Sequence, residues 1–175
     1  GKFEQAKSAF DNCLALDKNE VSIRLERAAL LRRSGNNSAA LNDLNLAISA
    51  RPKFIDPYLE RAKLKDALGD PSALADYSTV VALGPKDPGS YMMRAEFYRR
   101  NKQFVKAVED FNRAVQLSPR DADAYIGRGQ AYESMSQWAQ ALTNYRQALP
   151  LSPEDKSMLE AKITKLVKLT SKTGR

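Results

Sequence analysis

The sequence contains no histidine, a single cysteine and only eight glycines among its 175 residues. Histidine is the commonest general base and metal ligand in proteins, so its absence removes most catalytic and metal-binding arrangements. One cysteine allows neither a disulfide within the chain nor a thiolate metal site. No glycine-rich loop that could cradle a phosphate is present either. An enzyme, a bound metal and a bound cofactor are therefore not expected.

Long hydrophobic runs are also missing, and none approaches the length of a membrane span. The hydrophobic content of 43% is nevertheless enough for one continuous core. No signal peptide is visible, but the chain begins at Gly1 within a repeat described below, which predicts a fragment of a longer protein. The compartment stays open, with the cytoplasm as the default expectation. Cys13 occupies a small-residue position of that repeat and is expected to be buried and unreactive.

A pattern of small and aromatic residues recurs through the chain every 33 to 34 residues. The last copy consists of Tyr125, Gly129, Tyr132, Ala141, Tyr145, Ala148 and Pro153. The copy before it consists of Tyr91, Ala95, Tyr98, Ala107, Phe111, Ala114 and Pro119. Looser copies begin at Arg24 and Tyr58, and Ala6, Phe10 and Cys13 match the second half of another. A period of this size indicates stacked helix pairs, because one pair cannot bury its apolar face alone.

These residues resemble the tetratricopeptide repeat family over residues 1–153. The resemblance implies an all-α, right-handed superhelical solenoid of stacked antiparallel helix pairs. The expected segments are the second helix of a truncated repeat at 1–18, four repeats at 21–53, 54–86, 87–120 and 121–153, a capping helix at 154–170 and a tail at 171–175. In the capping helix, the inward face is expected to hold Leu159, Ile163, Leu166, Val167 and Thr170, and the opposite, charged face Lys162, Lys165, Lys168 and Lys172.

The chain departs from the family pattern in a regular way. Arginine replaces the leucine before the small residue in every repeat, at Arg27, Arg61, Arg94 and Arg128. The second helices carry Asp43, Asp76, Asp110 and Asn144 at a matching position. We expect a ladder of hydrogen bonds within pairs or between neighbouring repeats, worth only about 0.2 to 1 kcal/mol per partly exposed pair. Alternatively, the arginines lie along apolar surface and serve packing.

The resemblance also implies an inner groove lined by the first helix of each pair, which binds an extended peptide or a single helix. An apolar column of in-phase residues is expected there or in a partly covered core, formed by Leu25, Leu59, Met92 and Ile126. Its expected neighbours are Glu26, Asp56, Glu60, Lys63, Met93, Glu96 and Gln130. Phe104 and Trp138 are expected to pack on their own helix pairs. These features predict a scaffold or adaptor for protein partners; they predict no oligomeric state.

Two other binding modes can be weighed from the residues. The family's carboxylate clamp, which holds chaperone C-termini, needs cations, but its positions hold Leu25, Ala29, Glu60, Gly89 and Met93, or Leu59, Lys63, Met93, Asp123 and Gly127 in the later frame. A chaperone-tail adaptor is therefore not expected. The net charge is +7, and part of the excess forms a basic patch at Arg99, Arg100, Lys102 and Lys106. This patch is either a solvated helix face or an attachment point for nucleic acid, an anionic membrane or an acidic peptide.

Overall fold

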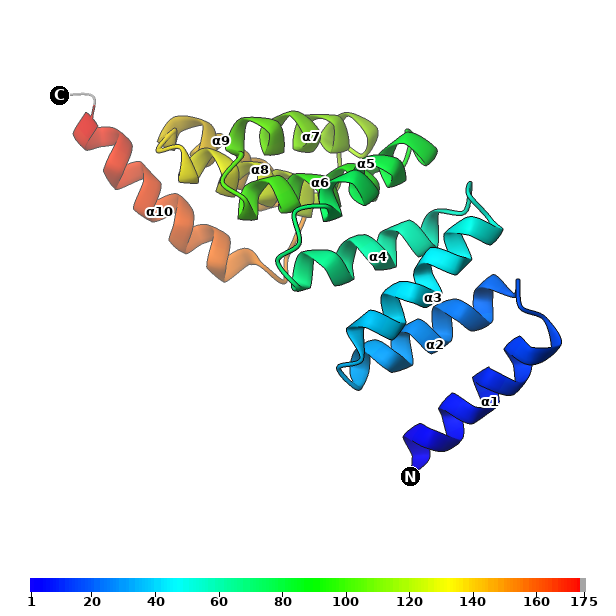
Figure 1. Ribbon diagram of the computed structural model, residues 1–175. Coiled ribbons are helices and arrows are strands. Elements are labelled where there is room, and N and C mark those ends of the chain that lie inside the picture. The colour runs from blue at the N-terminus through cyan, green and yellow to red at the C-terminus, as the bar shows by residue number, and fades with distance from the viewer. Residues whose placement is uncertain (174–175) are drawn as a thin grey trace. The chain divides into compact units, whose positions relative to one another are not determined.

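The computed structural model describes residues 1–173, and every regular element in that range is an α-helix (Figure 1). The helices are α1 (Lys2–Leu16), α2 (Val21–Arg33), α3 (Asn37–Ala50), α4 (Ile55–Ala67), α5 (Ala73–Leu83), α6 (Pro88–Arg100), α7 (Phe104–Leu117), α8 (Ala122–Ser134), α9 (Trp138–Ala148) and α10 (Lys156–Thr173). None of the helices within residues 1–173 is both long and apolar enough to cross a membrane. The expected all-α solenoid is confirmed.

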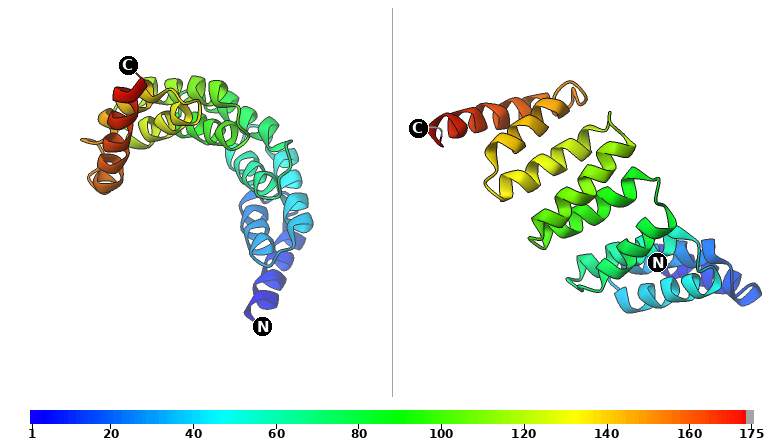
Figure 2. Two further views of the ribbon diagram at one scale, coloured as in Figure 1. Left: turned by 90° about the vertical axis from the view of Figure 1, so that its left-hand side faces the viewer. Right: turned by 90° about the horizontal axis from the view of Figure 1, so that it is seen from above.

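The chain divides into two compact units, Gly1–Gly84 with α1 to α5 and Pro85–Arg175 with α6 to α10. In each unit, helices that follow one another pack as antiparallel neighbours (Figure 2). In the first unit α2 packs on α3 and α4 on α5, while α1 and α3 contact the adjacent pair. In the second unit α6 packs on α7 and α8 on α9, and α10 covers α9. Each helix pair thus shares its apolar surface with a neighbour.

The cores are made where small residues let helices approach one another. The first unit buries Ala28, Leu31, Ala40, Leu44 and Leu64. Cys13 on α1 is exposed, so the expectation that it is buried was wrong. In the second unit Gly129 faces Tyr145 of its own pair so closely that a β-carbon would lie 2.8 Å from the ring atom Cε1. A β-carbon at Gly127 would lie only 2.3 Å from Cζ of Phe111, on the preceding pair. The predicted small residue Gly129 thus makes room for the Tyr145 ring within its own pair, and Gly127 makes room for the Phe111 ring of the preceding pair.

The turns inside the pairs share one backbone conformation. Gly35 and Gly69 have φ angles of 80° and 72°, and the in-phase residues Lys102 and Ser136 have 58° and 59°. The next residue in this phase is Thr170, whose branched side chain disfavours left-handed backbone. The helix continues through it, so α10 has 18 residues where the first helices have 13. Residues 171–173 of the expected tail are therefore helical, while 174 and 175 lie outside the described residues.

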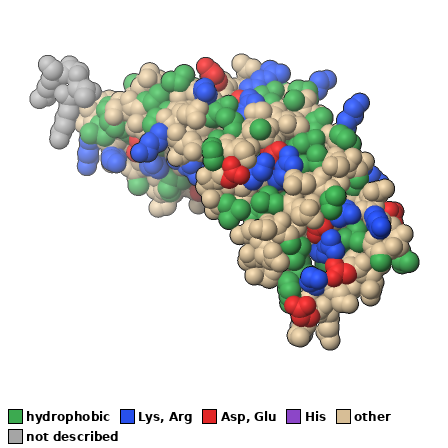
Figure 3. All heavy atoms as spheres, in the orientation of Figure 1, with side chains coloured by type: hydrophobic (Ala, Val, Ile, Leu, Met, Phe, Trp, Pro, Cys, Tyr) green, Lys and Arg blue, Asp and Glu red, His purple; other side chains and the backbone are tan. Residues whose placement is uncertain are grey.

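The capping helix α10 packs with a face that differs in part from the expected one. Leu159 and Leu166 are fully buried against α9, and Ile163 packs beside them. Val167 is 41% exposed, so its assignment to the inward face was wrong. Lys162 was wrongly placed on the outer face, because it lies three residues after Leu159 and four before Leu166, on the same helical stripe. Basic side chains lie along α10 on the surface drawn in Figure 3.

Lys162 meets a carboxylate at the junction of α8, α9 and α10. Glu133 Oε2 accepts hydrogen bonds from Lys162 Nζ at 2.8 Å and from the Tyr145 hydroxyl at 2.7 Å. Lys165 Nζ lies 3.8 Å from the other oxygen. Burial tends to raise the pKa of Glu133, but the bonds from Lys162 and Tyr145 outweigh burial and hold that pKa below its usual value. Glu133 therefore anchors the capping helix as an anion.

The arginine ladder confirms the predicted pairing in all four repeats. Each arginine on a first helix donates to the in-phase residue of its own second helix, with the closest contacts at 2.6 Å for Arg27 and Asp43, 2.5 Å for Arg61 and Asp76, 2.7 Å for Arg94 and Asp110, and 2.6 Å for Arg128 and Asn144. Each of the three aspartates accepts hydrogen bonds from two nitrogens of its own ladder arginine. Such a bidentate bond fixes the orientation of both side chains.

The same guanidinium groups also reach the preceding second helix. Arg61 Nη1 donates to Asn45 of α3 at 2.6 Å, and Arg128 Nη1 donates to Asn112 of α7 at 2.8 Å. Arg27 Nη1 makes the equivalent bond to Asp11 of α1 at 2.5 Å. Both predicted alternatives, contacts within a pair and contacts between repeats, are thus made by one side chain. The ladder joins three helices at each of these arginines.

Burial changes the expected energetics of this ladder. Asp43, Asp76 and Asp110 are only 1%, 3% and 7% exposed, so the estimate made for partly exposed pairs was too small. A buried ion pair contributes little compared with an apolar pair, but a buried carboxylate that loses its partner costs about 3–5 kcal/mol. The ladder therefore makes misalignment of the helices costly. It specifies their register more than it adds to net stability.

We predict that replacing Arg94 with methionine destabilises the protein more than the same change at Arg128. Arg94→Met leaves the Asp110 carboxylate buried without its cation, at a cost of about 3–5 kcal/mol. Arg128→Met leaves a neutral amide, whose Nδ2 keeps its bond to Gln140, and should cost about 1–2 kcal/mol. Urea unfolding of the two variants measures the difference. Equal losses would show that the charge of the buried partner is unimportant.

We also predict a pH dependence of the capping helix. Because the folded pKa of Glu133 is lowered, its contribution is fully present above the unfolded pKa of about 4.3 and is lost as the pH falls through the folded pKa. Glu133→Gln should be less stable than the parent chain near neutral pH, and this difference should shrink toward pH 3. Urea midpoints at both pH values give the comparison. A difference that stays constant with pH would contradict an anionic anchor.

Candidate functional site

The apolar column expected on the first helices divides into residues with different surroundings. Ile126 is 9% exposed and belongs to the core around Tyr145. Leu25 and Met92 are partly buried and pack against the edges of their own unit's cores. Leu59 is partly buried on α4. Ile126 thus fits the core alternative, while the other three side chains keep accessible surface.

Two of the predicted groove residues line one cleft in the first unit. Leu25 on α2 and Glu60 on α4 lie on its walls, and its volume is about 10 Å³. The full lining is Leu25, Ala28, Ala29, Arg32, Leu44, Glu60 and Leu64. We call it the α2–α4 cleft. Its walls are mainly apolar, and it carries one residue of each charge.

Arg32 is the residue of this cleft that the sequence analysis missed. It stands in the last turn of α2 and is exposed. Its guanidinium makes no hydrogen bond or ion pair within residues 1–173. The available signal was its position, seven residues after Leu25, which places both on one helical face. An exposed arginine beside an apolar surface can bind a carboxylate while an apolar group packs on the partly buried rim of the cleft.

The other predicted neighbours of the column are polar residues with varied surroundings. Glu60 accepts a hydrogen bond from Lys63 at 2.9 Å, one turn along the same helix. Glu26 and Asp56 are exposed on α2 and α4. In the second unit Met93, Glu96 and Gln130 are partly buried on α6 and α8. The acidic side chains outnumber the basic ones among the predicted neighbours.

The basic patch is partly neutralised by its surroundings. Arg99 forms an ion pair with Glu96 at 2.9 Å. Lys106 bonds Gln103 at 3.0 Å and lies 5.6 Å from the centre of the Tyr98 ring. Arg100 and Lys102 are exposed at the end of α6 and in the following turn. This patch therefore offers a weaker anion site than its four formal charges suggested.

One position of a carboxylate clamp is acidic in the second unit, at Asp123. Burial and the nearby charges of Asp121, Asp155 and Glu154 raise the pKa of Asp123. The same surroundings that disfavour an ionised Asp123 would disfavour the carboxylate of a ligand. The described residues also include no group of three or more acidic or cysteine side chains able to hold a metal ion.

Both loop aromatics lie partly buried at the start of second helices. Trp138 packs against the core shared by α8, α9 and α10, as expected for a structural residue. Phe104 begins α7 and is also partly buried. Neither ring is fully exposed at the start of its helix.

Comparisons with known proteins agree with this architecture. The tetratricopeptide repeat model matches residues 89–154. Human tetratricopeptide repeat protein 6 is 29% identical over 110 residues, which cover 61% of this chain and 21% of that protein. The chain thus spans about a fifth of this curated relative.

Solved structures show the same fold at low sequence identity. A tetratricopeptide repeat protein from Parabacteroides merdae has a TM-score of 0.81 at 20% identity, over 100% of this chain and 70% of the other. MamA has a TM-score of 0.77 at 21% identity, over 90% and 92% of the two chains. YrrB has a TM-score of 0.75 at 19% identity, over 94% and 84%. The chain therefore has the all-α tetratricopeptide repeat solenoid fold, and its residues 89–154 match the model of that family.

Proposed function

We propose that this chain is a non-catalytic scaffold that binds a peptide or helix of a partner protein on its first helices. The α2–α4 cleft carries the proposal, because it combines apolar walls with an unpaired guanidinium at Arg32. An apolar side chain of the partner would pack on the accessible surface of Leu25 and Ala29 at the mouth of the cleft, and an adjacent carboxylate would bind Arg32. The partner is thus a segment in which acidic and apolar residues stand close together.

The charges around the cleft set the register of such a segment. Glu60 lies on the α4 side and already accepts a bond from Lys63, so its free oxygen favours a basic group of the partner. Arg32 on the α2 side favours an acidic group. Opposite charges on the two walls select one direction of the bound segment over the reverse. Apolar burial then provides most of the affinity.

Known structures of the same fold support a peptide as the ligand class. YrrB is described as a tetratricopeptide repeat protein with an unusual peptide-binding site. The carboxylate clamp is not proposed for this chain, because Glu60 and Asp123 stand where a clamp requires cations. The groove residues Leu59, Met92, Met93, Glu96 and Gln130 remain candidates for further contacts along the first helices.

We predict that covering the mouth of the α2–α4 cleft weakens binding of peptides selected against the whole chain from a random display library. Ala29→Arg places a long charged side chain in the cleft and should weaken binding at least tenfold, which is about 1.4 kcal/mol. Ala139→Arg adds the same side chain at an exposed alanine of α9 and is the matched control. Fluorescence anisotropy with labelled peptides measures both affinities. Equal weakening by the two variants would contradict the proposed site.

Salt dependence separates this proposal from an adaptor for nucleic acid or an anionic membrane. Affinity based on apolar burial should change little between 50 and about 200 mM salt. A steep linear fall of log affinity with log salt, together with loss of binding on Lys102→Ala, would instead support attachment through the basic patch. The affinities of the display-selected peptides for the parent chain and for Lys102→Ala, measured by fluorescence anisotropy at both salt concentrations, give this comparison.

A further inference from the structure

The first repeat differs from the other three at one position of its first helix. Tyrosines occupy this position in the later repeats, and each hydroxyl donates to the carbonyl oxygen of a proline six residues earlier, with distances of 3.1 Å for Tyr58 and Pro52, 3.3 Å for Tyr91 and Pro85, and 3.2 Å for Tyr125 and Pro119. The first repeat has Arg24, whose Nε and Nη2 donate to the carbonyl of Lys18 at 2.9 and 2.5 Å. The polar contact is kept, but the aromatic ring is missing.

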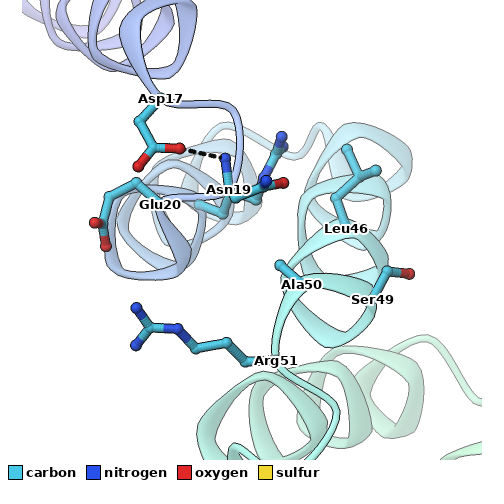
Figure 4. A pocket seen from close by; sticks show the side chains of 8 residues that line it. Asp17, Asn19, Glu20, Leu46, Ser49, Ala50 and Arg51 are labelled. Carbon is cyan, nitrogen blue, oxygen red and sulfur yellow. Dashed lines mark hydrogen bonds between the residues drawn. The ribbon is translucent and has the colours of Figure 1, made fainter.

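A pocket lies beside Arg24, between the α1–α2 turn and the end of α3. Figure 4 shows Asp17, Asn19 and Glu20 of the turn on one side and Leu46, Ser49 and Ala50 of α3 on the other, with Arg51 at the end. Its volume is about 520 Å³, within the usual range of about 300–1,000 Å³ for ligand pockets. Leu46 is 40% exposed there. We call this the Arg24 pocket.

Arg24 is held rigidly at this pocket. It is 8% exposed, and Nη1 donates to the buried carboxylate of Asp43 at 3.2 Å in addition to the two bonds to Lys18. Arg24 lines the pocket with the small part of its surface that stays exposed, and an aromatic ring placed there can stack on its planar guanidinium. Because its orientation is set before any ligand binds, little entropy is lost on stacking.

The other repeats show that a ring fits against an arginine at this level of the fold. The ladder arginines Arg61 and Arg128 lie over the rings of Tyr58 and Tyr125, at 5.8 and 5.4 Å from their centres. Within residues 1–173, Arg27 of the first repeat has no such ring contact. In the later repeats a ring thus lies beside an arginine of the first helix, whereas the first repeat has arginines at both positions and no ring of its own.

We propose that the Arg24 pocket binds a tyrosine side chain of a partner protein. The ring stacks on the guanidinium of Arg24 and covers Leu46, and the hydroxyl bonds to a polar group of the lining such as Ser49 or Asn19. Tyrosine fits better than phenylalanine because most of the lining is polar. This site is separate from the α2–α4 cleft, so it stands or falls independently of the proposed function.

N-acetyltyrosinamide is the probe for this site, titrated into the whole labelled chain and followed by amide chemical shifts. The expected dissociation constant is about 1 mM, as for a fragment of this size. Shift changes should be confined to residues 17–24 and 46–51. N-acetylleucinamide, which is apolar but has no ring, should leave these signals in place up to tenfold higher concentration.

Arg24→Tyr is the decisive variant, because it gives the first repeat the residue found in the other three. Its own ring should fill the pocket, and binding of the probe should weaken at least tenfold. Arg33→Tyr makes the same substitution at an exposed arginine at the end of α2 and should bind like the parent chain. Leu46→Arg, which changes an exposed wall residue, provides a second test if Arg24→Tyr unfolds.

Three results would overturn the proposal. The first is that the leucine probe shifts the same signals at the same concentration as the tyrosine probe. The second and third are that folded Arg24→Tyr, or Leu46→Arg, binds the tyrosine probe as tightly as the parent chain does. Each of these outcomes would mean that the pocket does not select an aromatic ring through Arg24. Loss of binding in both pocket variants, with binding kept in Arg33→Tyr, supports it.

Discussion

The bond between an arginine on each first helix and an acceptor on the paired second helix is the constraint on which the repeats depend. The arginine immediately precedes the small residue where the two helices approach most closely, so its guanidinium reaches both its own second helix and the preceding one. Because three of the acceptors are buried carboxylates, a helix that rotates or slides leaves a charge without a partner. Apolar packing drives association, and the ladder selects one register.

The end of the second unit uses the same position with different chemistry. Lys162 follows Arg128 by 34 residues and is therefore in phase with the ladder. It bonds to Glu133 on α8, together with the Tyr145 hydroxyl, and not to a second helix of its own. Thr170, at the position of the left-handed turns, lets α10 continue as a single helix. Lys162 at the ladder position and Thr170 at the turn position thus distinguish the capping helix from the first helix of a repeat.

Much of this architecture could be predicted from the sequence. The period of 33 to 34 residues placed the helix pairs, and the arginine that recurs before the small residue pointed to its partners on the second helices. Both features are regular patterns along the sequence and do not depend on how the helices pack. The burial of Asp110 and the inward position of Lys162 could not be predicted, because they depend on how far neighbouring helices cover each side chain. Gly127 was assigned only to a binding position, whereas it admits the ring of Phe111.

The candidate sites were less predictable for a related reason. Helical phase placed Leu25 and Glu60 on corresponding faces of their helices, but it could not distinguish Leu59 from Ile126, which is nearly covered. Arg24 looked only like a poor match to the repeat pattern, and its pocket depends on how the α1–α2 turn packs beside the end of α3. Deviations from a repeat are therefore as informative as the repeat itself, once the neighbouring helices are known.

Hydrogen exchange in an Arg61→Met variant tests the central claim most directly. Arg61 bonds Asn45 of α3 and Asp76 of α5, so its loss should increase amide exchange in both helices relative to the parent chain. Lys63→Met, an exposed cation two residues away on the same helix, should leave both unchanged. Faster exchange in α5 alone, or in neither helix, would contradict the claim that one arginine couples neighbouring repeats.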